Sequence, residues 1–409
     1  MTNYEINNLK SSEKPALFIL IILISLASMG SVLPSPALTD IAKAYTVLPH
    51  QAEWVITMFV LGYALSQIFY GPVSNSIGRK KALYIGVSIS ILGGLICSFS
   101  QNFEMLILGR FIMAIGSGCG LNMTFTIIND CYESIEARKV IAYATSAFAI
   151  LPGLAIFFGG ELTTNIGWRS CFIFLTIFSF FALFLIKKLP ETHAESNRVK
   201  FNLNNILIQY HRALSNPRIY VYTGLWGVST SIIYVVSATS SIVAIHSFGL
   251  TASGFSVLFM VIMALYFIGN IITAKLSDKA TSRQLFVLGA VISTIGAIIL
   301  VIGNQFFEPS KILFFIPLAM IYLGLPMIFS TASAQAMHHA VDKSTTSSVV
   351  SFMIMMIAFI SASSVSSIHS NLYHYLPFII LGFMLIINIL IVFEFKLFNH
   401  TVTTSKNPK

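Results

Sequence analysis

The sequence predicts an all-α membrane protein whose twelve transmembrane helices form two six-helix halves. Only 10% of its 409 residues are charged and 56% are hydrophobic, whereas soluble domains carry about 25% charged residues. The mean hydropathy is +0.82. Apolar runs of about 20 residues recur along the chain, which is the length that a helix needs to cross a hydrocarbon core of about 30 Å. Because lipid offers no partner to open backbone groups, segments this long are expected to be helical.

Twelve such runs can be drawn, and the longest polar stretch separates the sixth from the seventh. The predicted spans are 16–36, 51–75, 82–101, 105–129, 140–161, 168–187, 218–245, 252–276, 283–303, 312–337, 345–368 and 375–397. This spacing divides the chain into an N-terminal half (1–188), a linker (189–217) and a C-terminal half (218–409). Within the linker, residues 201–214 fit either a short amphipathic helix on the membrane surface or a structureless connection.

The positions of Lys and Arg predict how the chain is oriented. With the N-terminus inside, all of the 24 basic residues except Lys43, Arg110, Arg169 and Lys311 fall in turns and tails on the cytoplasmic side. Short loops rich in Lys and Arg stay in the cytoplasm, so we expect both termini there. The net charge of +9 therefore needs no nucleic-acid partner. The four cysteines show no metal-ligand spacing, and we expect no metal site.

A short basic turn joins the second and third predicted spans. It reads GPVSNSIGRKKAL over residues 71–83. It resembles the signature loop of the major facilitator superfamily, G-x-x-x-D-x-x-G-R-K, and keeps both glycines and the basic pair. Asn75 stands where the pattern has aspartate. In that family the loop is thought to hold the cytoplasmic side shut; the alternative is that its cations only set the orientation.

Further stretches resemble the same superfamily. LILGRFIMAIG at 106–116 resembles its fourth-helix motif around Arg110, and Pro152 with Gly159 and Gly160 resembles its fifth-helix antiporter region. ALTDIA at 37–42, FGLT at 248–251 and the Asn129-Asp130 pair resemble the Bcr/CflA branch of the drug:proton antiporters, which have twelve helices. The resemblance implies the major facilitator fold, with a cavity between the halves at mid-membrane.

The resemblance and the turn positions together give a set of candidate gating residues. Pro152 is expected to bend the fifth span by removing a backbone donor, which serves either gating or packing. Asp278 lies in the turn after the eighth span, at the position in the second half that corresponds to the Gly71 turn. The set comprises Gly71, Asn75, Gly78, Arg79, Lys80, Asp130, Pro152 and Asp278.

Arg110 is the strongest single candidate for the transport site. A cation within a span costs roughly 2.5 kcal/mol or more, so it should face the bundle interior and have a partner there. Asn122 lies on the same helix face, three turns further along. The alternative is a structural arginine that ties the first helix to the fourth.

Neutral polar and aromatic residues form stripes on three other spans. Residues at helical spacing share one face in the second, seventh and eighth spans. Such stripes favour an aromatic, amphipathic ligand, although Ser and Thr in membrane helices more often serve packing. The candidates are Tyr63, Gln67, Tyr234, Ser237, Tyr266 and Asn270.

The first span carries no acid, since residues 16–39 contain neither Asp nor Glu. The family commonly places an acid there as the proton carrier. Asp40 and Glu53, near the outer face, are candidates for coupling; the alternatives are a less obvious site or no proton coupling. We therefore expect a weaker dependence on the pH gradient than in relatives that have the acid.

These observations favour a bacterial inner-membrane secondary transporter. We expect a multi-pass monomer in the lipid bilayer that exports a small amphipathic compound, either a drug-like toxin or a metabolite such as a siderophore, by alternating access. The proton gradient would drive it, without a cofactor. Import or facilitated diffusion of a neutral solute is the alternative within transport. A polytopic enzyme or sensor is the alternative of another class; no catalytic constellation supports it, and no phosphate-binding G-x-x-x-x-G-K-[ST] motif supports ATP hydrolysis.

Overall fold

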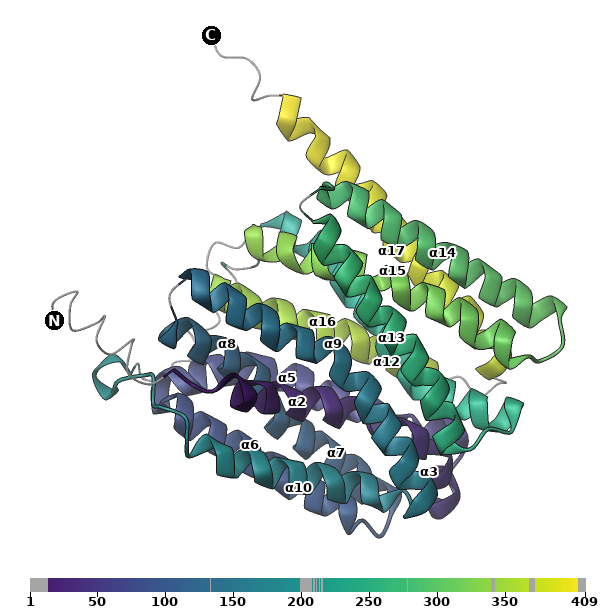
Figure 1. Ribbon diagram of the computed structural model, residues 1–409, viewed down its shortest axis with the longest axis horizontal. Coiled ribbons are helices and arrows are strands. Elements are labelled where there is room, and N and C mark those ends of the chain that lie inside the picture. The colour runs from purple at the N-terminus through teal and green to yellow at the C-terminus, as the bar shows by residue number, and fades with distance from the viewer. Residues whose placement is uncertain are drawn as a thin grey trace.

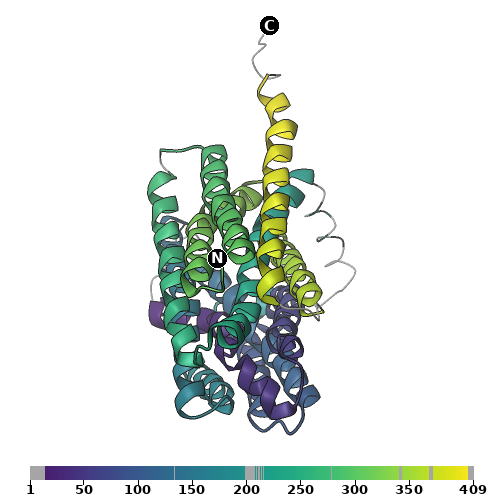
Figure 2. The same ribbon diagram turned by 90° about the vertical axis from the view of Figure 1, so that its right-hand side faces the viewer.

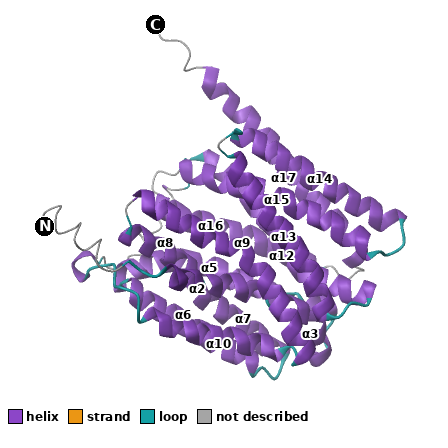
Figure 3. Ribbon diagram, in the orientation of Figure 1, coloured by secondary structure: helices purple, strands orange, loops and turns teal. Residues whose placement is uncertain are grey.

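The computed structural model describes residues 14–403 except 133, 199–207, 209, 211, 213, 215, 278, 340–342 and 368–371. Within these residues every regular element is a helix (Figure 3). The elements are α2 (Leu17–Val32), η1 (Ser35–Ala37), α3 (Leu38–Tyr45), α4 (Pro49–Ala52), α5 (Trp54–Ile77), α6 (Arg79–Ser98), α7 (Phe103–Ser117), α8 (Cys119–Cys131), α9 (Ser134–Asn165), α10 (Arg169–Ile186), η2 (Glu195–Asn197), α12 (Pro217–Phe248), α13 (Ala252–Leu276), α14 (Ser282–Phe306), α15 (Lys311–His338), α16 (Lys343–Ser366) and α17 (Leu372–Thr403).

The prediction of an all-α protein with twelve membrane spans is confirmed. Eleven helices or runs of joined helices in the described part of the chain are long and apolar enough to cross a membrane. The remaining predicted span, 140–161, lies within α9. Two spans are interrupted. The first gives way to the 3₁₀ turn η1 at Pro34 and Pro36, which lack a backbone donor, and the fourth is divided at Gly118 into α7 and α8.

The helices run between two ends of the molecule (Figure 1). We call one the linker end, because it carries the Gly78 turn and residues 187–198. The other is the distal end, with residues 46–48, 99–102, 166–168 and 307–310. Figure 2 shows α17 extending beyond its neighbours at the linker end.

The helices fall into a first group, α2–α10, and a second group, α12–α17. The groups meet chiefly where α5 packs on α16 and α9 packs on α13. Large apolar side chains cover outward helix faces, as Phe180, Phe184, Ile298 and Ile302 do on α10 and α14. Because lipid is the solvent of these faces, such exposure is expected of a membrane protein.

Candidate functional site

The Gly78 turn connects α5 to α6 at the linker end. Gly78 has φ 100°, a conformation that residues with a Cβ rarely adopt. A Cβ there would also lie only 2.6 Å from a carboxylate oxygen of Glu191. The backbone conformation therefore requires glycine, and a side chain there would also displace the Glu191 carboxylate.

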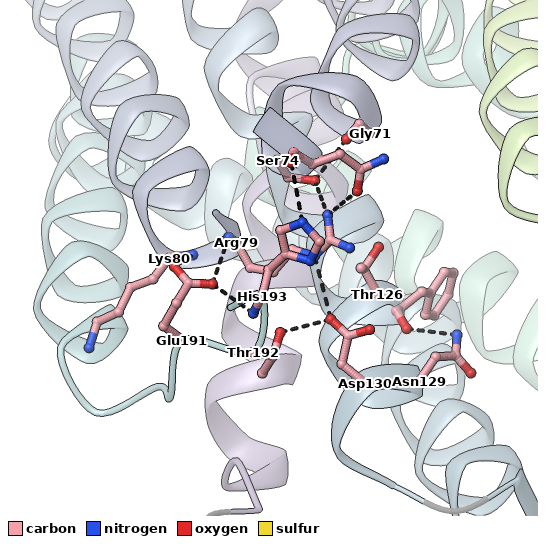
Figure 4. Close-up of polar contacts among 12 residues, drawn as sticks. Gly71, Ser74, Arg79, Lys80, Thr126, Asn129, Asp130, Glu191, Thr192 and His193 are labelled. Carbon is pink, nitrogen blue, oxygen red and sulfur yellow. Dashed lines mark hydrogen bonds and ion pairs between the residues drawn. The ribbon is translucent and has the colours of Figure 1, made fainter. Parts of the chain in front are cut away.

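Arg79 is the centre of a polar cluster at this turn (Figure 4). Its side chain is buried, and Nε lies 3.4 Å from Oδ2 of Asp130 at the end of α8. Nη1 donates to Ser74 Oγ at 2.7 Å and to Asn75 Oδ1 at 2.5 Å. Thr192 Oγ1 donates to the same Asp130 oxygen at 2.8 Å. The structure thus brings together three of the residues that the sequence predicted for gating.

Glu191, just beyond α10, supplies the anion at the first turn of α6. Its carboxylate accepts hydrogen bonds from the backbone N–H groups of Arg79 at 2.9 Å and Lys80 at 3.2 Å. A helix N-terminus attracts an anion, because its N–H groups have no partner within the helix. Nζ of Lys80 donates to the carbonyls of Lys187 and Leu189. The turn is therefore fastened to the end of α10 by both its backbone and its side chains.

Sequence reasoning did not identify Glu191, Thr192 and His193 as part of this cluster. His193 Nε2 lies 3.2 Å from the carbonyl oxygen of Asn75. An acid directly after the sixth span, on the same predicted side as a basic turn, was the available signal. The predicted counterpart in the second half, Asp278, lies outside the described residues.

The second group has a different polar cluster at the linker end. Arg283 Nε lies 3.5 Å from Oε2 of Glu394, and the Tyr222 hydroxyl donates to Oε1 at 3.2 Å. Glu394 is 6% exposed. These residues come from α14, α17 and α12, so the pairing joins three helices that the sequence could not place side by side.

Arg110 lies fully buried in α7 without a carboxylate partner among the described residues. Nε donates to the carbonyl of Val55 in α5, and Nη1 donates to the carbonyl of Gly30 in α2, each at 2.8 Å. The guanidinium carbon lies 4.3 Å from the centre of the Phe59 ring, close enough for a cation–π contact. Arg110 thus faces the bundle interior as predicted, and it ties the fourth span to the first and second.

Tyr63 and Tyr234 meet where the two groups face each other at mid-depth. Both are nearly buried, and they lie close enough to interact electrostatically. Ser31 of α2 lies beside the Tyr234 side chain. Residues from α2, α5 and α12 therefore converge, and two of them belong to the predicted stripes.

Two amides of the first group, Gln67 in α5 and Asn122 in α8, have unused hydrogen-bonding capacity. Gln67 Nε2 donates to the Tyr63 carbonyl at 3.3 Å, while its buried Oε1 has no partner among the described residues. The buried Nδ2 of Asn122 in α8 likewise has none there. A buried polar group without a partner is costly, so these atoms are suited to receive a ligand or water.

Tyr266 and Asn270 face a different neighbour, the helix α15. The Tyr266 ring centre lies 6.1 Å from that of Tyr322. Asn270 donates to the carbonyl of Tyr266 and accepts from Ser330 Oγ at 3.5 Å. These two residues therefore lie on the α13–α15 contact, apart from the Tyr63 and Tyr234 pair.

The described hydrogen bonds that join the two groups directly gather at the distal end. We call this set the distal closure. It consists of Ser35 Oγ with the Ser237 carbonyl, Ser366 Oγ with Glu53 and Thr57, and Ser253 with Glu161 and Thr164. Near the linker end, a Cβ on Gly71 would meet Ser348 only at 3.5 Å, an ordinary contact.

The two candidate coupling acids lie in unlike surroundings. Asp40 in α3 keeps 46% of its side chain exposed, 3.9 Å from Lys43. Glu53 is fully buried within the distal closure. Pro152, the candidate for a bend, lies inside α9, which runs unbroken from Ser134 to Asn165.

Comparison with known proteins identifies the family of this chain. The Major Facilitator Superfamily matches the chain over residues 20–364. The chain belongs to the major facilitator superfamily. It is 25% identical over 327 residues to multidrug resistance protein D of Escherichia coli, covering 78% of this chain and 80% of that protein. Identity to a bicyclomycin resistance protein homolog of Haemophilus influenzae is also 25%, over 68% of this chain and 69% of the relative.

A third relative is the quinolone resistance protein NorB of Staphylococcus aureus, 32% identical over 47% of this chain and 40% of NorB. Solved structures share the fold. A D-xylose–proton symporter aligns with TM-score 0.75 and 14% identity over 92% of this chain and 96% of the symporter. The partially occluded inward-open xylose transporter XylE of Escherichia coli aligns with TM-score 0.73 and 13% identity, over 93% of this chain and 98% of XylE.

These findings confirm the resemblance that the Gly71 turn and Arg110 predicted, including the drug:proton antiporter branch. The protein is a multi-pass membrane transporter of a small molecule and not an enzyme. Transporters of this superfamily need no cofactor. Within the described residues, no three His, Cys, Asp or Glu side chains gather as metal ligands would.

Proposed function

We propose that this major facilitator superfamily transporter exports small amphipathic, drug-like compounds by alternating access, driven by the proton gradient. The central observation is that Tyr63 and Tyr234 lie close together where the two groups meet, while Gln67, one turn along the helix from Tyr63, and Asn122 of α8 each have a buried amide atom without a partner among the described residues. Arg110, the cation of the fourth span, is engaged by backbone carbonyls through Nε and Nη1, while its buried Nη2 has no partner among the described residues. Such a site suits a mostly apolar ligand with a few polar groups. The names of the drug-resistance relatives support the same substrate class.

The proposal includes the setting of the protein. The linker end would face the cytoplasm of a bacterium, with both termini there and the distal end outside the inner membrane. The protein would act as a monomer, with halves 1–188 and 218–409 moving about the linker 189–217. The basic residues that the turns place at the linker end support this orientation.

Transport by the purified protein in proteoliposomes tests the substrate class. We expect a quinolone or bicyclomycin to be transported against its gradient when a pH gradient of about two units is imposed, and xylose not to be transported. Alanine at Tyr63 or Asn122 should reduce quinolone transport. Downhill xylose flux without quinolone flux would contradict export of drug-like compounds and favour the neutral-solute reading.

Asn75→Asp tests the role of the basic turn as a gate. Asn75 is exposed beside Arg79, one turn beyond the point where Gly71 approaches Ser348 of α16. An added carboxylate there would pair with Arg79 and place negative charge one turn from the contact with Ser348, near the N-terminal end of α16, which attracts anions. We expect the linker end to close more often and the distal end to open more often, by a few-fold. Cysteine labelling from the two sides would measure this shift; the same labelling in both proteins would contradict a gate role.

A further inference from the structure

Glu53 has surroundings that are unusual for a carboxyl group. It precedes α5 at the distal end and is 0% exposed. Oε2 accepts a hydrogen bond from Ser366 Oγ of α16 at 2.9 Å, across the contact between the two groups. Its other oxygen, Oε1, is buried and has no partner within the described residues.

No described cation pairs with Glu53, although several titratable groups lie on the elements packed around it. His50 lies about one turn earlier, in α4, and takes part in an interaction of its own. The α7 side offers exposed Glu104 and the buried guanidinium of Arg110, which donates to the carbonyl of Val55, two residues along from Glu53, and α12 offers exposed His246. In α6 the buried thiol of Cys97 is the titratable group near this end. α16 contributes the neutral Ser366, and His369 beyond it lies outside the described residues.

An ionised carboxylate in this position would be unstable. Burying a charge without a paired cation costs far more than burying a neutral carboxyl group, so such a group takes up a proton instead. A single hydrogen bond from Ser366 does not replace the water that a carboxylate loses. The distal closure therefore fits the neutral form of Glu53, whereas separation of α5 from α16 would expose Glu53 to water and favour the ionised form.

We propose that Glu53 is a proton-operated latch of the distal closure. When the closure forms, the Glu53 carboxylate binds one proton from water on the distal side, forming an O–H bond; when the closure opens, the proton returns to that water. The latch rests on the proposed function only in that it needs alternating access. The latch makes the distal closure depend on the pH of the compartment at the distal end. This dependence is separate from any proton that crosses the membrane.

The position of Glu53 distinguishes a latch from a proton carrier. Glu53 and Tyr63 are ten residues apart on one helix, which is about 15 Å at 1.5 Å per residue. The closed state buries Glu53 at the distal end, away from the mid-depth site. The sign of the effect follows from linkage: over the pH range in which Glu53 is ionised when open and neutral when closed, each unit of rising pH lowers the closed-to-open ratio tenfold.

Distances measured by spin-label spectroscopy test this latch in the full-length protein in lipid nanodiscs. Labels at Lys43→Cys and Glu308→Cys, both exposed at the distal end, report the separation of the two groups. Cys131, the native cysteine that is not buried, is replaced by Ala. Spectra are recorded from pH 5.5 to 9 for the wild type at position 53, for Glu53→Gln, and for the matched control Glu104→Gln.

We expect the closed fraction to fall with rising pH in the wild type and in Glu104→Gln. In Glu53→Gln the closed-to-open ratio should change less than about twofold across the range, because glutamine has no proton to lose. His50→Gln and His369→Gln should follow the wild type. If Glu53→Gln folds poorly, Glu53→Ala serves as the second variant, and we expect it to lack the pH response as well.

Three results would overturn the latch. The first is a wild-type pH response in Glu53→Gln, and the second is a pH response that disappears in a histidine variant instead. The third is a loss of uphill transport in Glu53→Gln with unchanged distances, which would make Glu53 a carrier. A protein that shows the expected pH response but transports none of the tested drugs would contradict the proposed substrate class and still support the latch.

Discussion

Arg110→Ala is expected to abolish transport while the protein still inserts into the membrane. The guanidinium holds the Gly30 carbonyl of α2 and the Val55 carbonyl of α5 and lies against the Phe59 ring. Removing it leaves the Gly30 carbonyl without a donor, at about 1–3 kcal/mol, because the residue four positions on is Pro34, which has no N–H; the Val55 carbonyl keeps its helical donor within α5. The substitution also leaves a cavity between three helices of the first group. Because α2 and α5 also carry Ser31 and Tyr63, the mid-depth site would lose its geometry.

Drug transport in proteoliposomes and the thermal unfolding midpoint together measure this effect. Arg110→Lys is the matched variant: it keeps the charge but not the fork of donors that reaches two helices. We expect it to unfold at a temperature between those of the wild type and Arg110→Ala, with transport still strongly reduced. Wild-type transport by Arg110→Ala at normal expression would show that this tie is dispensable.

The spans and their order could be predicted from the sequence because hydropathy depends on local composition. The turn at Gly78 could be predicted as well, since its motif is contiguous. The helix-to-helix partners could not. Glu191 reaches the turn only because the chain after α10 folds back across the end of α6. Arg110 donates to backbone carbonyls, which every residue has and which no sequence pattern marks.

The two coupling candidates illustrate the same limit. Asp40 and Glu53 are both acids near the distal ends of predicted spans, and nothing in their local sequence separates them. Their surroundings differ because α3 leaves Asp40 exposed beside Lys43, whereas Glu53 is enclosed where α5 meets α16. Tertiary packing thus decides which acid is buried. The sequence could name both acids but could not rank them.

Neighbouring glycines of α9 provide the second prediction with a large effect. Gly159 packs against the backbone of Leu33 within the first group, whereas Gly160 packs against Ser256 and Ala252 of α13 in the second. An added methyl would overlap those atoms at either position. Overpacking of this kind costs about 1–3 kcal/mol. At Gly160 that cost falls on the contact between groups, so it acts mainly on the closed state.

Gly160→Ala is therefore expected to lower the closed-to-open ratio of the distal end by about 5- to 150-fold, which is what 1–3 kcal/mol corresponds to. Its thermal unfolding midpoint should change little, because the methyl can be accommodated by opening. Gly159→Ala should instead lower the unfolding midpoint and leave the distances between the Lys43→Cys and Glu308→Cys labels unchanged, since Leu33 lies in the same group and does not separate when the distal end opens. Equal effects of the two variants on both measurements would contradict the division of α9 into one face that holds the first group together and one that closes against the second.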